Sequence, residues 1–138
     1  MVSITYTSTA RRPFSSRELF RLLQKCRANN ERIGVTGLLV YKDGCFVQLL
    51  EGKGVDVDAA FLSANRDPRH TGIVKLIETG IAARQFADWP MAFFNLDTTG
   101  ARGVPGFPDL ETLSFADPEF LSEPDVVRRL MLALREQL

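Results

Sequence analysis

The feature that most constrains the fold is an apolar hairpin, "GVTGLLVYKDGCFVQLLEG", which spans residues 34–52. Asp43-Gly44 in its middle is typical of a two-residue turn between antiparallel strands. Both flanking runs are apolar at nearly every position, and a strand that is apolar on both faces must be covered on both sides. We expect Val35, Leu39, Val47 and Leu49 on one face and Leu38, Val40, Phe46 and Leu50 on the other. The hairpin therefore predicts a central sheet with a layer above it and a layer below it.

Gln48 interrupts the second apolar run of this hairpin. A buried primary amide without hydrogen-bond partners is penalised by about 1–3 kcal/mol. The protein must therefore supply polar neighbours for Gln48, or the amide serves a ligand.

The remaining periodicities surround the hairpin with alternating strands and helices. Period-two alternation predicts strands over 2–8, 72–79 and 89–96, with Tyr6 on the apolar side of the first. Helical spacing predicts helices over 15–30, where Ser15 and Glu18 form a capping box, and over 53–66. The order β-α-β-β-α-β-β indicates an α+β fold, a ferredoxin-like mixed sheet with two helices on one face and one extra strand.

The C-terminal part is predicted to cover the opposite face of the sheet. Residues 98–121 are rich in Gly and Pro and are expected to be irregular with one short helical turn. Residues 122–138 carry an amphipathic helix pattern, with Ser122 and Asp125 as its N-terminal cap. We therefore divide the chain into a ligand-binding domain over 1–97 and a C-terminal extension over 98–138.

Composition excludes several function classes. The 138 residues suffice for one domain, and 17 basic residues balance 17 acidic ones, so nothing favours binding to nucleic acid or to an acidic membrane surface. No apolar run reaches the length of a membrane span, and the N-terminus lacks a signal-peptide pattern, so a cytoplasmic location is expected. Cys26 and Cys45 form no CxxC motif, and His70 is the single histidine, so we expect no metal site.

Three polar side chains are predicted to converge. The first and third strands of a ferredoxin-like sheet are neighbours, which brings Tyr6 beside Gln48, and the inward stripe of the first helix ends at Asn30, with Asn29 beside it. A phenol and carboxamides around an apolar slot suit a flat heteroaromatic ligand with amide-like edges. None of these groups is a strong nucleophile or a general base at neutral pH, so we expect no enzyme active site.

The chain also resembles a known family. The matching pieces are "ITYTSTA", "CRANNERIGVTGLLVYKDGCFVQLLEG", "RDPRH" and "ARQFADWPM", which follow one another from Tyr6 to about Phe94. In this order and spacing they resemble the BLUF family, the blue-light sensors that use flavin. The resemblance implies a non-covalently bound FAD, with FMN or riboflavin as alternatives.

The resemblance implies a role for each matching residue. Tyr6 matches the tyrosine that gives an electron and a proton to the excited flavin, and Gln48 matches the glutamine whose hydrogen bonds are rearranged in the signalling state. Trp89 and Met91 match a pair on the last strand that senses this glutamine. Tyr6, Gln48, Trp89 and Met91 together are therefore the expected photoactive switch.

The remaining matches concern flavin binding. Asn30, supported by Asn29, matches the asparagine that holds the ring edge, while Asp67, Arg69 and His70 match a motif near the ribityl and phosphate part. The chain departs from the family at Ser63, where some members have a basic residue, and Arg66 is a possible substitute. Pro90, between Trp89 and Met91, is a second departure.

We therefore expect a blue-light photoreceptor without substrate turnover that signals to a separate output protein. A homodimer or higher oligomer is a further possibility. One alternative is a light-insensitive regulator that binds flavin or another metabolite. Another is a small acylphosphatase-like enzyme on the same fold, which would use Arg11 and Arg12 after the first strand to bind an anion.

Overall fold

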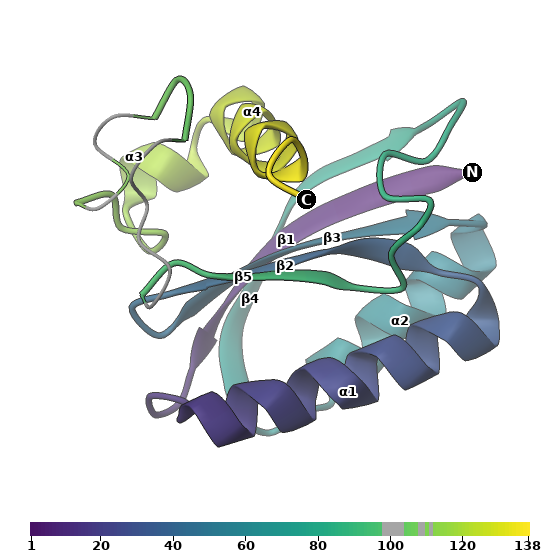
Figure 1. Ribbon diagram of the computed structural model, residues 1–138, viewed down its shortest axis with the longest axis horizontal. Helices are drawn as coiled ribbons and strands as arrows, with labels where there is room; N and C mark the ends of the chain where they lie inside the picture. The colour runs from purple at the N-terminus through teal and green to yellow at the C-terminus, as the bar shows by residue number, and fades with distance from the viewer. Residues whose placement is uncertain (98–103, 108–109, 111) are drawn as a thin grey trace.

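The computed structural model describes residues 1–97, 104–107, 110 and 112–138, and its centre is a five-stranded sheet (Figure 1). The elements are β1 (Val2–Ala10), α1 (Ser16–Ile33), β2 (Thr36–Lys42), β3 (Cys45–Gly52), α2 (Gly54–Asn65), β4 (His70–Gly80), β5 (Ala92–Asn95), α3 (Pro118–Leu121) and α4 (Pro124–Arg135). The strand order is β4-β1-β3-β2-β5, with β5 parallel to β2 and the other neighbours antiparallel. The ferredoxin-like prediction is confirmed.

The first helix begins where the sequence predicts and ends later. Ser15 accepts a hydrogen bond from the backbone N–H of Glu18 and Glu18 accepts one in return, so the predicted capping box is present. The helix ends at Gly34, whose φ of 71° is the left-handed conformation that glycine adopts without strain. Asn29 and Asn30 therefore lie inside the helix, although the sequence pattern placed its end there.

The hairpin faces differ from the prediction. The two-residue turn pairs Lys42 with Cys45, so an odd-numbered residue of β2 shares a face with an even-numbered residue of β3. Leu39 consequently faces the helices together with Gln48, whereas Val47 lies on the opposite face beside Val40. The predicted grouping of Leu39 with Val47 was wrong because it did not apply this register.

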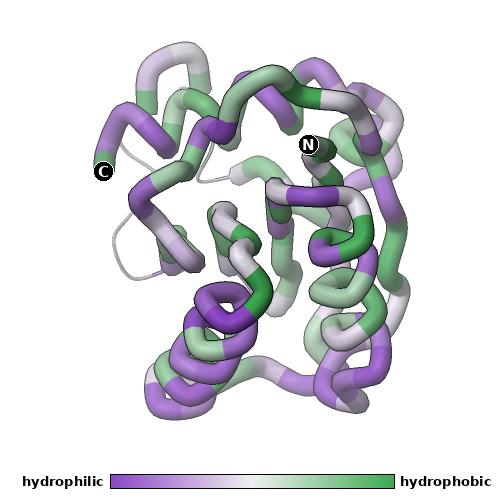
Figure 2. The backbone as a smooth tube through the Cα atoms, turned by 90° about the vertical axis from the view of Figure 1, so that its right-hand side faces the viewer, coloured by the Kyte–Doolittle hydropathy of each residue, from purple (hydrophilic) through white to green (hydrophobic). Residues whose placement is uncertain are grey.

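Two hydrophobic cores lie on the two faces of the sheet. The first is formed with α1 and α2 below the sheet in Figure 1, and its largest members include Tyr6, Phe46 and Leu50. The second is formed with α4 above the sheet, and it joins β2 and β3 to the helix residues Val127, Leu130, Met131 and Leu134. Of the two lower helices, α1 is the more hydrophilic and α2 the more hydrophobic (Figure 2). The hairpin is thus covered on both sides, as its composition predicted.

Two element boundaries also differ from the prediction. Ser122 ends α3 and its hydroxyl donates to the carbonyl oxygen of Glu119, so it does not cap α4, which begins at Pro124 after Glu123. The last strand begins only at Ala92, so Trp89 and Met91 precede it.

Residues 98–103, 108–109 and 111, part of the segment expected to be irregular, lie outside the described residues. Within the described ranges no helix has the length and apolar character needed to cross a membrane.

Candidate functional site

The centre of the candidate site is a hydrogen bond between the first and third strands. Tyr6 of β1 is paired directly with Gln48 of β3, and its hydroxyl donates to Gln48 Oε1. Tyr6 is only 2% exposed, and burial raises the pKa of its hydroxyl far above the usual range. The phenol therefore keeps its proton at neutral pH and holds the amide in one orientation. The two residues are neighbours, as the predicted sheet order required.

The other end of the Gln48 amide points to Met91. Gln48 Nε2 lies 3.9 Å from the sulfur of Met91, which is completely buried. Trp89 is 38% exposed, so of the two predicted sensing residues the structure brings only Met91 against Gln48. The resulting row Tyr6–Gln48–Met91 crosses the helix-facing side of the sheet.

The segment before β5 is held by hydrogen bonds from α1 and β2. Asn30 Nδ2 donates to the carbonyl oxygen of Pro90 at 2.8 Å, and Arg27 Nε donates to that of Met91 at 2.9 Å. The backbone N–H of Gly37 donates to the carbonyl oxygen of Trp89 at 3.1 Å. Asn30 is buried, and its hydrogen bond ties the segment carrying Met91 to α1, the helix that borders the cavity described next.

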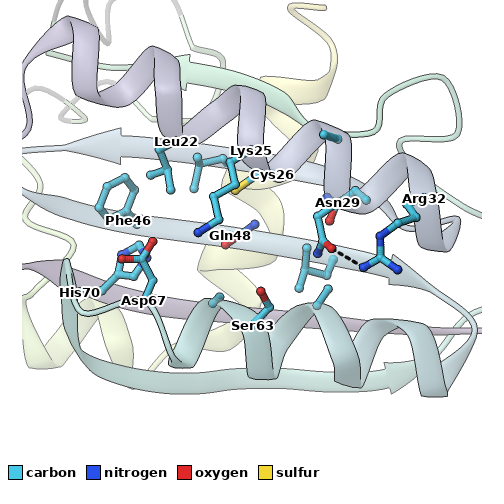
Figure 3. Close-up of a pocket in the computed structure, with 16 residues that line it drawn as sticks. Leu22, Lys25, Cys26, Asn29, Arg32, Phe46, Gln48, Ser63, Asp67 and His70 are labelled. Carbon is cyan, nitrogen blue, oxygen red and sulfur yellow. Dashed lines mark hydrogen bonds and ion pairs between the residues drawn. The ribbon is translucent and has the colours of Figure 1, made fainter.

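A cavity of about 400 Å³ opens beside Gln48, between α1, α2 and the sheet (Figure 3). Its walls combine apolar side chains, such as Leu22, Leu39 and Phe46, with the predicted site residues Asn29, Asn30, Gln48, Asp67 and His70. Asn29 Oδ1 accepts a hydrogen bond from Arg32 at 2.7 Å, drawn as a dashed line in Figure 3. The volume lies in the range of small-molecule sites, which are typically apolar with a few placed polar groups.

The motif residues 67–70 close one end of this cavity. Arg69 binds the carboxylate of Asp67 through its Nη2 at 2.6 Å and its Nε at 2.9 Å, and these bonds lower the pKa of Asp67 to about 2. His70 lies 3.8 Å from Asp67 and edge-on to Phe46, and burial lowers its pKa below the usual value. Among the described residues nothing bonds to the buried Nδ1 of His70, so a bound molecule could supply its partner.

Arg66 and Arg69 do not line the cavity beside Gln48. Both line an adjoining hollow of about 630 Å³ together with Arg21, Lys25 and Ser63. The two hollows share the residues Lys25, Ser63 and Asp67. The predicted binding residues thus fall into two groups, one around Gln48 and one toward the protein surface.

Sequence reasoning missed several residues of the site. Lys25 extends from α1 into the cavity beside the strand of Gln48 (Figure 3), and Arg32 lines the same space. Lys25, Asn29 and Arg32 are spaced by four and three positions, so their common helix face was readable from the sequence. Cys26 also lines the cavity, and burial raises the pKa of its thiol to about 11, which keeps it protonated at neutral pH.

Glu51 was missed for a different reason. It is almost completely buried, and its carboxylate accepts hydrogen bonds from the backbone N–H groups of Phe86 at 2.6 Å and Gln85 at 2.8 Å. It thereby fixes the loop between β4 and the Met91 segment. Its partners are backbone groups some 35 residues later, which no local pattern reveals.

The donor set suits recognition and switching better than hydrolysis. The buried row offers a protonated phenol, an amide with donor and acceptor ends, and a thioether, none of which acts as a base at neutral pH. Of the two arginines considered for an enzyme, Arg11 donates its Nε to the carbonyl oxygen of Pro68, and Arg12 is largely exposed and lies 3.6 Å from Glu18. An amide between two partners can be reoriented at small steric cost, because its O and NH2 ends are nearly equal in size. The turn exchanges a donor for an acceptor and so changes the hydrogen bonds of both partners.

Comparison with known proteins identifies related chains. The model of the BLUF family, described as sensors of blue-light using FAD, matches residues 1–92. A photoactivated adenylate cyclase subunit beta from Euglena longa is 34% identical over 92 residues, which are 66% of this chain and 11% of that protein. A beta-like relative from Euglena gracilis is 28% identical over 137 residues, 94% of this chain and 15% of that protein. The chain thus spans between a tenth and a sixth of the length of these relatives.

Solved structures extend the similarity to the whole chain. The dark-state structure of BlrB, a BLUF protein, is 33% identical with a TM-score of 0.82 and covers 99% of this chain and 96% of that one. A bacterial light-regulated adenylyl cyclase is 28% identical with a TM-score of 0.73, covering 94% of this chain and 36% of that one. The similarity to BlrB includes the C-terminal part, beyond the 92 residues of the family model.

Proposed function

The chain belongs to the BLUF family of blue-light sensors, whose domains bind FAD non-covalently, and we propose that its response to light is a rearrangement of the Tyr6–Gln48–Met91 row. Family membership makes the chain a blue-light flavin photoreceptor. The roles of its individual residues are the proposal.

Three features of the cavity suit a flavin, two for its ring and one for its ribityl chain. Its apolar walls suit a flat aromatic system, and Asn29, Asn30 and Gln48 provide amide groups for the polar ring edge. The buried His70 Nδ1 provides a partner for a ribityl hydroxyl. Asn30 serves a second purpose, because its hydrogen bond to Pro90 links the ring site to the segment that carries Met91.

The flavin supplies the absorption of blue light and the capacity to take up an electron and a proton transiently. Tyr6 is the donor, because its hydroxyl is buried, protonated and bonded to Gln48 Oε1. Once the proton leaves Tyr6 Oη, the phenol no longer donates to Gln48, and the amide is free to turn or to change tautomer. Gln48 Nε2 then leaves Met91, which transmits the change to β5. The low polarity around this row makes each of its hydrogen bonds consequential.

The observation that carries the proposal is the hydrogen bond from the buried Tyr6 to Gln48 at the cavity wall. The test is the absorption spectrum of the purified protein before and after blue light. We expect a yellow protein whose flavin band shifts to longer wavelength and recovers in the dark. A flavin-bound protein without any shift would instead be the light-insensitive regulator, and a protein that stays colourless after addition of flavin would refute both.

Three further points belong to this proposal. We infer that residues 1–97 form the flavin-binding unit and that residues 98–138 form an extension docked through α4. BLUF proteins signal to output domains or partners, and for this chain we propose a separate output protein, with self-association as a second route. The cytoplasmic location stays a prediction from the sequence.

A further inference from the structure

We propose that Arg27 is a positioning residue of the light response. Its hydrogen bond to the backbone of Met91 keeps the Met91 sulfur against Gln48, and it thereby sets how fast the dark state returns. This inference rests on the proposed function and adds a residue to it. Arg27 is not among the described residues that line the cavity beside Gln48, so it acts through Met91 and not on the flavin.

The first argument is the way in which the segment before β5 is held. Each of the three carbonyl oxygens of residues 89–91 accepts one hydrogen bond. One comes from the backbone of β2, and two come from α1, from Asn30 to Pro90 and from Arg27 to Met91. Residues 27 and 30 lie on one face of α1 because they are three positions apart. Pro90 has no backbone N–H, so the position of this segment depends on its carbonyl contacts.

The second argument is that Arg27 binds the residue that contacts the amide. Met91 is completely buried, and its sulfur lies 3.9 Å from Gln48 Nε2. A methionine side chain has three rotatable bonds and adapts readily to its surroundings. Its contact with Gln48 is therefore reproducible only if the backbone from which the side chain starts is fixed. The carbonyl group that Arg27 binds is bonded directly to the Cα of Met91, so this hydrogen bond fixes that starting point.

The third argument is the strength of the hydrogen bond. Arg27 is half-buried, and its Nε lies 2.9 Å from the carbonyl oxygen of Met91. A hydrogen bond from a charged donor is stronger than one between neutral groups. Within the described part of the chain, no carboxylate forms an ion pair with Arg27 and competes for it. Arg27 is thus a strong and available donor to the Met91 carbonyl.

The expected consequence concerns the return to the dark state. In the proposed light response Gln48 Nε2 leaves Met91, and the return to the dark state forms this contact again. A Met91 held in place offers the amide its partner, whereas a loosely held Met91 makes the dark arrangement less favourable and its recovery slower. One hydrogen bond of ordinary strength corresponds to about a two- to tenfold change in an equilibrium constant, which bounds the effect on the recovery rate.

The test uses two substitutions of equal length. In glutamine Nε2 is as many bonds from Cα as Nε is in arginine, so Arg27→Gln removes the charge and keeps a donor at that position. Arg27→Met places a methyl group there and removes both the charge and the donor. Both new residues are good helix formers, so α1 should be preserved. The pair therefore isolates the hydrogen bond, since the two variants lose the same charge.

Each flavin-loaded protein is measured in two ways. The first is the recovery of the flavin absorption band in the dark after blue light. The second is the NMR spectrum of isotope-labelled methionine methyl groups, for which the chain offers three residues. Met91 reports on the switch, while the buried Met131 in the core on the opposite face of the sheet and the exposed Met1 serve as internal references.

We expect the wild type and Arg27→Gln to share the Met91 signal and to recover at rates within about twofold of each other. Arg27→Met should bind flavin as the wild type does, because Arg27 does not line the cavity. Its Met91 signal should shift or broaden, and its dark recovery should be about two- to tenfold slower. The Met131 signal should be the same in all three proteins.

Unchanged or faster recovery of Arg27→Met, or a wild-type Met91 signal in that variant, would overturn the inference and leave the photoreceptor function intact. An Arg27→Gln protein that behaves like Arg27→Met would also overturn it, because the charge and not the hydrogen bond would then be the cause.

The wild type provides a further test that does not depend on the folding of a variant. In the dark, the Nε–H of Arg27 should exchange with solvent more slowly than that of Arg17, which is exposed on the same helix. Equal exchange rates would overturn the inference. A flavin-bound wild type without any light-induced shift would instead refute the proposed function.

Discussion

The hydrogen bond between Tyr6 and Gln48 can be removed by changing either partner, and the two changes should lower the free energy of unfolding by unequal amounts. Tyr6→Phe removes the hydroxyl and keeps the ring, which packs edge-on against Phe61 at 4.9 Å between centroids. Gln48→Leu keeps about the same volume and removes the amide. The double variant removes both polar partners, so the three proteins form a double-mutant cycle around one bond.

The magnitudes follow from the surroundings of each atom that loses its partner. In Tyr6→Phe the freed Oε1 belongs to Gln48, which is 8% exposed and lines the cavity, so water can replace the phenol and the loss is about 1 kcal/mol. In Gln48→Leu the hydroxyl of Tyr6, which is 2% exposed, remains buried without an acceptor, and the loss is about 2–3 kcal/mol. In the double variant neither group remains, so we expect a loss of about 1 kcal/mol, far below the sum of the single effects.

The assay is urea unfolding of the flavin-free proteins, followed by circular dichroism, with all four chains measured under one condition. The same variants are then loaded with flavin and illuminated. We expect all of them to bind flavin, because burial of the ring is mostly apolar, and neither single variant to form the normal red-shifted state.

An additive cycle would refute the reasoning, since it would mean that the two groups do not depend on each other in the folded protein. A wild-type spectral shift in Gln48→Leu would show that Gln48 is not the switch. An unchanged response in Tyr6→Phe would move the electron donor elsewhere, with Trp89 the first candidate despite its exposure.

Three other predictions follow from the contacts. Arg69 lowers the pKa of Asp67 to about 2, so their ion pair contributes stability above about pH 4 that is lost as the pH falls toward 2. After solvent screening this contribution to the free energy of unfolding is about 1 kcal/mol. Asp67→Asn should remove this part of the acid sensitivity in unfolding measurements. Gly37→Ala should destabilise the protein by about 2 kcal/mol or more in urea unfolding, because the added methyl group would overlap the backbone carbonyl of Leu49; a neutral effect would mean that the strands can separate. Removing residues 122–138 should leave the flavin spectrum and expose the apolar face of the sheet, which lowers solubility or changes the oligomeric state in size-exclusion chromatography. In the full chain we expect α4 to carry the light signal to a partner, so its hydrogen exchange should differ between dark and light. Identical exchange of α4 and β5 in both states would exclude this role.

The contact that makes α4 a candidate for signalling is specific. Arg135 near its end bonds to the side chain of Gln85, whose backbone N–H donates to Glu51 at 2.8 Å. Glu51 lies three residues after Gln48 on the same strand. We expect a change at Gln48 to reach α4 through these contacts, and the exchange experiment tests this expectation.

Much of this protein was readable from local patterns. The two-faced apolar hairpin required cover on both sides, and the capping box at Ser15 and the turn at Asp43-Gly44 marked where elements begin and reverse. Family motifs then brought Tyr6 and Gln48 into one site. These features depend on residues that are neighbours in sequence or on a fixed order of elements, so a single chain suffices to reveal them.

Other features depended on how distant segments meet. The hairpin register decided that Leu39, and not Val47, accompanies Gln48 on the cavity side, because one residue of slip exchanges the faces of a strand. Hydrogen bonds from Asn30 and Arg27 to the segment before β5 placed Met91 inside, while Trp89 was left partly exposed. Ser122 has the composition of a cap for α4 but serves α3, since two possible helix starts compete within a few residues.

The sequence by itself therefore determined the layers, the order of the strands and the pairing of Tyr6 with Gln48, because each follows from periodicity or from a motif of fixed spacing. Only the tertiary structure decided which side chains share the cavity and that Lys25 joins it to a basic hollow. The hydrogen bonds around Gln48 and Met91 join residues that lie 42 to 64 positions apart, and no local pattern encodes the angle at which two helices and a sheet meet.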